Sequence, residues 1–179
     1  MTAASADSKR YAQPIAWLVF IALLVLAVVI INRPAADLPP RVAVHFDAAG
    51  SANSFMSRSN YHLFALLFAV GLPCAVVALL TVTYSRATVL KIPNREYWLD
   101  PSRLARTRAF LIAHAVWLGS LLVLMMCLIH WQVWQANQEE PAHLSNQSVM
   151  IALLAPLACI GVWVSILMRA FRRVPDRSR

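Results

Sequence analysis

The side chains best suited to chemistry lie in and just after a polar stretch in the first third of the chain. His45 and Asp47 stand two residues apart, and His62 follows at the start of the next apolar run. In an extended segment, side chains at this spacing point to the same side, and imidazole and carboxylate groups bind transition metals. A metal site on His45, Asp47 and His62 is therefore one hypothesis. We favour a turn in which His45 and Asp47 hydrogen-bond the loop backbone, because two ligands close in sequence are a weak metal signal.

Two further histidines, His114 and His130, share one apolar run and stand sixteen residues apart. On a helix they would be turned by roughly 160° and separated by about 24 Å along the axis, so they cannot form one site. Each lies close in sequence to tryptophan. We expect each histidine to make an interfacial or interhelical hydrogen bond, with a proton relay as the alternative.

Other reactive groups give little support for an enzyme. Cys74, Cys127 and Cys159 all fall inside apolar runs without a Cys-x-x-Cys spacing, which argues against a zinc site or a disulfide framework. The His-Glu-x-x-His pattern of metal-dependent hydrolases is also missing. We therefore expect no cofactor and favour a protein that is not an enzyme.

The composition indicates a membrane protein. Of the 179 residues, 60% are hydrophobic and 13% are charged, against about half and a quarter in soluble domains. Four apolar runs are long enough to span a bilayer, and they predict an all-α fold with helices at about 14–32, 61–84, 109–135 and 148–170. The length fits a single integral membrane domain over residues 1–179.

Prolines and length add detail to these helices. Pro14 is placed to open the first helix, since the first helical position has no internal hydrogen bond to lose. Gly71 and Pro73 should kink the second helix, and Pro156 the fourth. An uncovered carbonyl is costly in lipid, so both bends are expected to face protein. The third run is too long for a perpendicular crossing and should tilt or extend beyond the bilayer.

The basic residues predict the orientation. Thirteen lie in the N-terminal tail, the loop between the second and third helices, and the C-terminus: Lys9, Arg10, Arg86, Lys91, Arg95, Arg103, Arg106, Arg108, Arg169, Arg172, Arg173, Arg177 and Arg179. Three lie on the opposite side: Arg33, Arg41 and Arg58. The positive-inside rule then puts both termini in the cytoplasm of a bacterial cell, with the chain in its inner membrane. This surplus predicts contact with anionic lipid headgroups and removes the case for nucleic acid, although the net charge is +8.

The loop at 33–60 between the first two helices is expected to be ordered. It is too long to remain structureless in a compact domain. Val42, Val44 and Phe46 alternate with polar or small residues, as in a short strand with one apolar face, which we expect to pack on the helix ends. Asp47 to Gly50 reads as a tight turn, with Asp at its first position and Gly at its fourth.

The same stretch carries a pattern of spaced residues, Leu38-Pro39-x-x-Val42-x-x-His45-Phe46-Asp47-x-x-Gly50-x-x-Asn53, closing in Ser57-Arg58. It resembles the membrane domain of unknown function numbered 1648, found alone and at the front of SdpI-type immunity proteins, and covers roughly the first third to half of the chain. Ala43 and Arg58 stand where relatives commonly have proline and lysine. SdpI-type proteins protect a bacterium from its own secreted toxic peptide and have further spanning helices. The resemblance implies protein or peptide contact at the outer loop, through His45, Phe46, Asp47, Gly50 and Asn53.

The loop between the second and third helices holds a second candidate patch. Asn94, Tyr97 and Trp98 precede Asp100-Pro101, a cap and first position for the third helix. The patch is either an interfacial anchor or a cytoplasmic docking surface. For the whole protein, three roles stay open: a membrane protein acting by protein or peptide contact, a small transporter, and a metal-dependent membrane enzyme.

Overall fold

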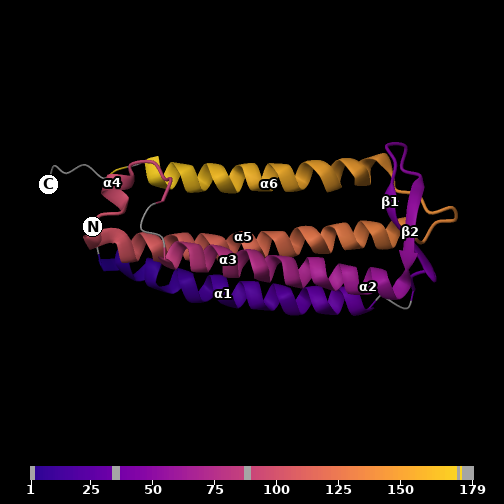
Figure 1. The fold of residues 1–179 in the computed structure, drawn as a ribbon, viewed down its shortest axis with the longest axis horizontal. Helices are drawn as coiled ribbons and strands as arrows, with labels where there is room; N and C mark the ends of the chain where they lie inside the picture. The colour runs from indigo at the N-terminus through magenta and orange to yellow at the C-terminus, as the bar shows by residue number, and fades with distance from the viewer. Residues whose placement is uncertain (1–2, 34–36, 87–89, 173, 175–179) are drawn as a thin grey trace.

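The computed structural model describes residues 3–33, 37–86, 90–172 and 174. It is mostly helical, and four of its helical stretches are long and apolar enough to cross a membrane: Pro14–Asn32, Arg58–Arg86, Pro101–Ala136 and Gln147–Arg172. A small two-stranded hairpin lies between the first two. Figure 1 shows the long helices running side by side, with the hairpin at one end and the short helix α4 (Arg95–Trp98) at the other. We call these the hairpin end and the α4 end. The predicted all-α class with an ordered loop is confirmed.

Some of the predicted positions lie outside the described ranges. These are residues 34–36 of the loop and, among the C-terminal basic residues, Arg173, Arg177 and Arg179.

The first helix, α1, spans Ala3–Asn32 and contains Pro14 in its interior. The prediction that Pro14 opens the helix was wrong. Residues 3–13 include several alanines together with Lys9, Arg10 and Gln13, which favour a helix. The φ of proline suits a helix too, so one missing backbone donor does not end it.

The second span is one continuous helical path with an irregular turn in its middle. It consists of α2 (Arg58–Leu66), the π-helical turn η2 (Leu67–Gly71) and α3 (Leu72–Arg86). The wider turn ends two residues before Pro73, whose missing backbone donor and ring would otherwise disturb regular helical bonding. Pro73 is fully buried, so this bend faces protein as predicted.

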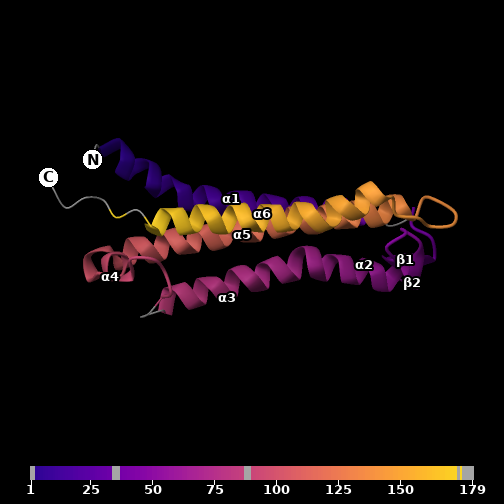
Figure 2. The ribbon, with the colours of Figure 1, turned by 90° about the horizontal axis from the view of Figure 1, so that it is seen from above.

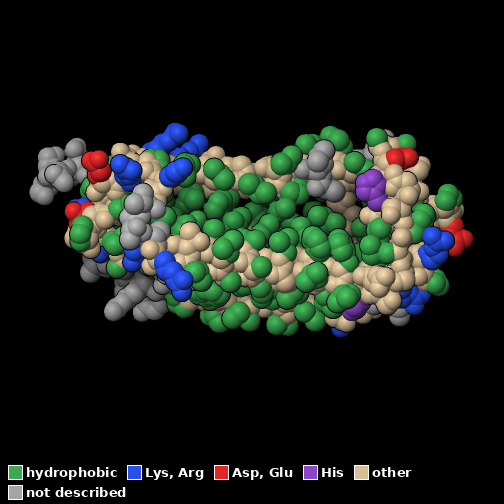
Figure 3. Space-filling model, in the orientation of Figure 1, with side chains coloured by type: hydrophobic (Ala, Val, Ile, Leu, Met, Phe, Trp, Pro, Cys, Tyr) green, Lys and Arg blue, Asp and Glu red, His purple; other side chains and the backbone are tan. Residues whose placement is uncertain are grey.

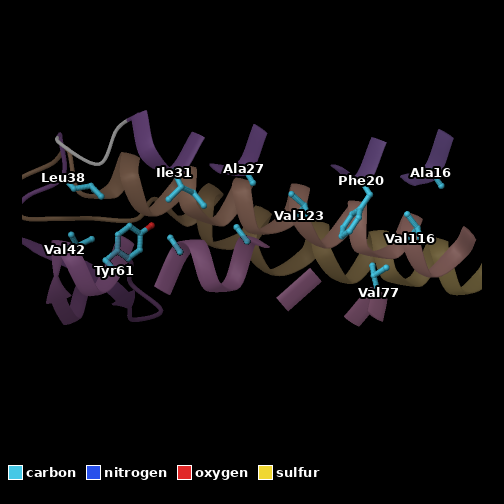
Figure 4. Packing of buried hydrophobic residues seen from close by; sticks show 12 residues of the cluster. Ala16, Phe20, Ala27, Ile31, Leu38, Val42, Tyr61, Val77, Val116 and Val123 are labelled. Carbon is cyan, nitrogen blue, oxygen red and sulfur yellow. The ribbon is translucent and has the colours of Figure 1, made fainter. Parts of the chain in front are cut away.

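Three spans pack into a bundle: α1, the α2–α3 path and α5 (Pro101–Ala136). Figure 4 shows their buried side chains in one line along the bundle. Gly119 of α5 permits a close approach of these helices. A Cβ atom there would lie 2.3 Å from Val77 Cγ2 of α3 and 3.0 Å from Phe20 Cε2 of α1. The predicted start of α5 is also confirmed, because Asp100 accepts a hydrogen bond from Ser102 N at 2.9 Å and Pro101 follows it.

The last helix, α6 (Asn146–Arg172), packs on the bundle less closely. Figure 2 shows it running beside α5, with α3 on the far side of α5. Its closest packing is near the α4 end, where Leu167 and Phe171 join Leu90 and Leu111 in a second buried cluster. Pro156 is half-buried, so the prediction that the bend at Pro156 faces protein is confirmed only in part.

The hairpin consists of β1 (Arg41–Phe46) and β2 (Ala52–Ser57), paired antiparallel. Its pairing register shifts between Ala43 and His45 and again between His45 and Phe46. Val42 is buried as expected, and Val44 and Phe46 are half-buried. Ala43 is buried as well. A strict alternation does not predict this, since a bulge interrupts the period of two.

Candidate interaction site on the hairpin

The tip of the hairpin is built by Asp47 and Gly50. Asp47 Oδ1 accepts hydrogen bonds from Ala49 N and Ser51 N, both at 2.9 Å. Gly50 N donates to Asp47 O at 2.9 Å. Gly50 has a φ of 84°, a conformation that a residue without Cβ adopts at little cost. The predicted turn is therefore present, and one carboxylate oxygen of Asp47 is engaged in forming it.

Gly50 also attaches the tip to the connection between α5 and α6. Leu144 N donates to Gly50 O at 2.8 Å, and Ser51 forms a β-bridge with His143. A Cβ atom on Gly50 would lie 2.0 Å from Leu144 O. The position therefore needs glycine for close approach as well as for its φ.

The base of the hairpin is held by Asn137, which follows the last turn of α5. Asn137 Oδ1 accepts from Ala43 N at 2.8 Å, and its Nδ2 donates to Ala43 O at 2.9 Å. Nδ2 also donates to Val133 O at 2.8 Å, which keeps the amide aligned with its own helix. The side chain thus acts on β1 as a neighbouring strand would. Sequence reasoning missed Asn137, because nothing in the local pattern distinguishes it from any polar residue at a helix end.

Two pairs of side chains remain exposed on the attached hairpin. His45 Nδ1 lies 2.5 Å from Asn53 Oδ1, so the histidine donates from Nδ1 in this pair. The guanidinium of Arg41 lies 5.5 Å from the ring centroid of Phe55, and Phe55 is 46% exposed. We call Arg41, His45, Asn53 and Phe55 the exposed hairpin cluster. It includes two of the five predicted contact residues; the other three, Phe46, Asp47 and Gly50, have mainly structural contacts.

The three weak metal candidates are not brought together. His45 is engaged with Asn53 and Asp47 with the turn, while His62 is a half-buried residue of α2. Among the described residues, no group of three His, Cys, Asp or Glu side chains is placed to hold a metal ion. The geometry therefore gives this hypothesis no support.

A buried polar pair lies just below the hairpin. Tyr61 Oη is 2.9 Å from His130 Nδ1, and the two rings stack with centroids 5.7 Å apart. This confirms the interhelical hydrogen bond expected for His130. His114 instead bonds Phe110 O, one turn earlier in its own helix, at 3.1 Å. Periodicity carries no sign of a partner on another helix, so the sequence did not identify Tyr61 as the partner of His130.

The second candidate patch, at the α4 end, is largely used within the chain. Asn94 Nδ2 donates to Phe171 O at 3.0 Å and to Arg172 O at 3.1 Å, and Trp98 Nε1 donates to Phe171 O at 2.9 Å. These carbonyls close α6, where a helix lacks internal donors. The ring of Tyr97 lies 4.2 Å from the Arg103 guanidinium. Asn94 and Trp98 thus attach the loop to α6, which leaves little of the patch for docking.

Comparison with known proteins identifies the part of the chain that holds the hairpin. No curated protein and no solved structure matches the chain. A family match covers residues 18–70, which include the second half of α1, the hairpin, α2 and all but the last residue of η2. The chain is thus a multi-pass membrane protein that contains the domain of unknown function DUF1648 at residues 18–70.

Proposed function

We propose that this protein sits in the bacterial cytoplasmic membrane and acts by binding a protein or peptide at its hairpin, on the outer side. The observation that carries the proposal is the contrast within the hairpin. Its backbone is attached to distant residues, Asn137 and Leu144, yet Arg41, His45, Asn53 and Phe55 stay exposed. A surface that is held in shape before binding loses less conformational freedom when a partner arrives.

The charge distribution supports this orientation. The basic residues of the loop between α3 and α5 and those in the last turn of α6 lie at the α4 end. Cytoplasmic segments carry the excess of Lys and Arg, which directs the α4 end inward and the hairpin outward. On the inner side the same residues attract anionic lipid headgroups, at about 1 kcal/mol for each one near the surface.

The hairpin also offers backbone groups to a partner. β2 pairs with β1 along one edge, and no strand in the described part of the chain pairs with its other edge. An extended peptide can add to such an edge through main-chain hydrogen bonds, while side-chain contacts give specificity. Phe55 and Arg41 are well suited to such contacts, because aromatic and Arg side chains dominate binding energies at interfaces. Immunity against a secreted peptide is one form of this function.

Crosslinking in cells tests the proposal. A photoreactive amino acid at position 55, in the exposed hairpin cluster, should give a discrete adduct with a protein or peptide. The same amino acid at Leu79, an exposed apolar position on α3, is the matched control and should give lipid adducts only. The His45→Ala variant should weaken the position-55 adduct while the protein stays folded. Identical adducts from both positions, or lipid alone at position 55, would refute the contact function.

A further inference from the structure

The middle of α6 is exposed around its whole circumference. Every residue from 157 to 162 is exposed, and six residues make more than one and a half helical turns. Ile160 is informative because it stands seven residues before Leu167 and eleven before Phe171, on the same helical face. Leu167 and Phe171 are buried, whereas Ile160 is 38% exposed. The face of α6 that packs on the bundle near the α4 end is therefore uncovered farther along.

The uncovered part of α6 faces a stretch of α5. His114 of α5 and Trp163 of α6 mark where the helices still meet, with ring centroids 6.5 Å apart. Leu118 and Leu121 follow His114 at four and seven residues, on the same face of α5. Both are only half-buried. We call the space between these two leucines and Ile160 the α5–α6 gap, and Figure 3 shows an apolar hollow beside α6.

Hydrogen bonds attach both ends of α6 to the rest of the chain, so the α5–α6 gap is closed at the hairpin end and at the α4 end. At the α4 end, Asn94 and Trp98 donate to the last carbonyls of α6. At the hairpin end, the connection that leads into α6 bonds to Gly50 through Leu144. A transmembrane helix from another protein, which crosses the full bilayer, would meet these closed ends. An acyl chain enters from the side and ends within the membrane.

We propose that the α5–α6 gap binds one acyl chain of an anionic glycerophospholipid whose headgroup lies at the α4 end. Ile160 stands nine residues before Arg169, which corresponds to about 14 Å along the helix. Half of a hydrocarbon core is about 15 Å, so an acyl chain whose headgroup lies at the level of Arg169 along the helix axis reaches the gap. The exposed Arg106 and Arg172 at this end complement a phosphate, whereas Arg169 lies about 180° around α6 from Ile160. The lipid would join α6 to the bundle where direct packing is lacking.

Native mass spectrometry of the purified full chain in detergent tests the site, with phosphatidylglycerol and phosphatidylcholine added as probes. The wild type should retain one phosphatidylglycerol per chain after phosphatidylcholine is stripped. Ile160→Trp fills the gap and should weaken that binding by about tenfold. This is the loss expected when two methylene groups of the acyl chain are no longer buried. Gly161→Trp adds the same side chain about 100° around α6 from Ile160, where a Cβ meets nothing within 4 Å, and should bind as the wild type does. The double change Arg106→Gln and Arg172→Gln should reduce the preference for phosphatidylglycerol over phosphatidylcholine.

The outcomes separate this site from its rivals. Equal effects of Ile160→Trp and Gly161→Trp would indicate general lipid contact and overturn the proposal. Equal retention of both lipids would overturn the anionic headgroup. A second protein chain retained in place of lipid would make the gap a helix-docking surface and refute the lipid site. Helical content measured by circular dichroism should match the wild type in every variant.

Discussion

A hydrogen bond of 2.9 Å between Tyr61 Oη and His130 Nδ1 joins α2, the helix that follows the hairpin, to the part of α5 nearest the hairpin end. Both side chains are buried, and His130 Nε2 has no hydrogen-bond partner in the described part of the chain. The phenol is thus the only partner that the described residues offer this imidazole. The pair lies beneath the hairpin, so the hairpin rests on helices that a polar contact holds in register.

Tyr61→Phe should therefore destabilise the protein. It leaves a buried imidazole without its partner, which costs about 1–3 kcal/mol. Thermal unfolding in detergent micelles measures the effect. Tyr84→Phe is the control, because the same hydroxyl is removed from a half-buried residue of α3 with no hydrogen bond in the described structure. Equal melting temperatures for the two variants would contradict a stabilising role of the Tyr61–His130 bond.

Asn137→Ala should loosen the hairpin without unfolding the helices. The change removes three hydrogen bonds and leaves the backbone N–H of the buried Ala43 unpaired, a cost of about 1–3 kcal/mol. Limited proteolysis should cut the variant within residues 41–57 faster than the wild type. Gln138→Ala is the control, because Gln138 is exposed and bonds only Trp134 O, at 3.3 Å. If the wild-type hairpin is cut as fast as a disordered tail, the attached hairpin is refuted, and with it the basis of the proposed function.

Two glycine-to-alanine changes should act in opposite directions. At Gly119 the new methyl would lie 2.3 Å from Val77 Cγ2, so α3 and α5 must separate, at a cost of about 1–3 kcal/mol. At Gly161 nothing lies within 4 Å, and alanine should stabilise α6 by about 1 kcal/mol through its helix propensity. Melting temperatures in the same detergent compare the two. A stable Gly119→Ala variant would mean that the three helices are packed less closely than described.

Sequence patterns predicted those parts of the structure that depend on neighbouring residues. The turn at Asp47 and Gly50, the cap at Asp100 and the bend at Pro73 each follow from one to four adjacent residues with known backbone preferences. Contacts such as Asn137 with Ala43, Asn94 with Phe171 and Tyr61 with His130 join residues 69 to 94 positions apart. They depend on how helices meet in space, which hydrophobic periodicity does not encode. For this reason the sequence predicted the first strand and the turn of the hairpin, but neither β2 nor the residues that hold the hairpin in place.

The distribution of basic residues makes a direct prediction about orientation. Variants in which Cys74, Cys127 and Cys159 are replaced by serine receive a single new cysteine, and intact cells are treated with a thiol reagent that cannot cross the membrane. Ser51→Cys and Ser145→Cys lie at the hairpin end and should be labelled, whereas Ser102→Cys lies at the α4 end and should react only after the cells are opened. The reason is that thirteen of the sixteen Lys and Arg residues fall on the side of Ser102, and such residues are retained in the cytoplasm. Labelling of Ser102→Cys in intact cells would reverse the orientation, put the exposed hairpin cluster in the cytoplasm and overturn the proposed contact with an outer partner.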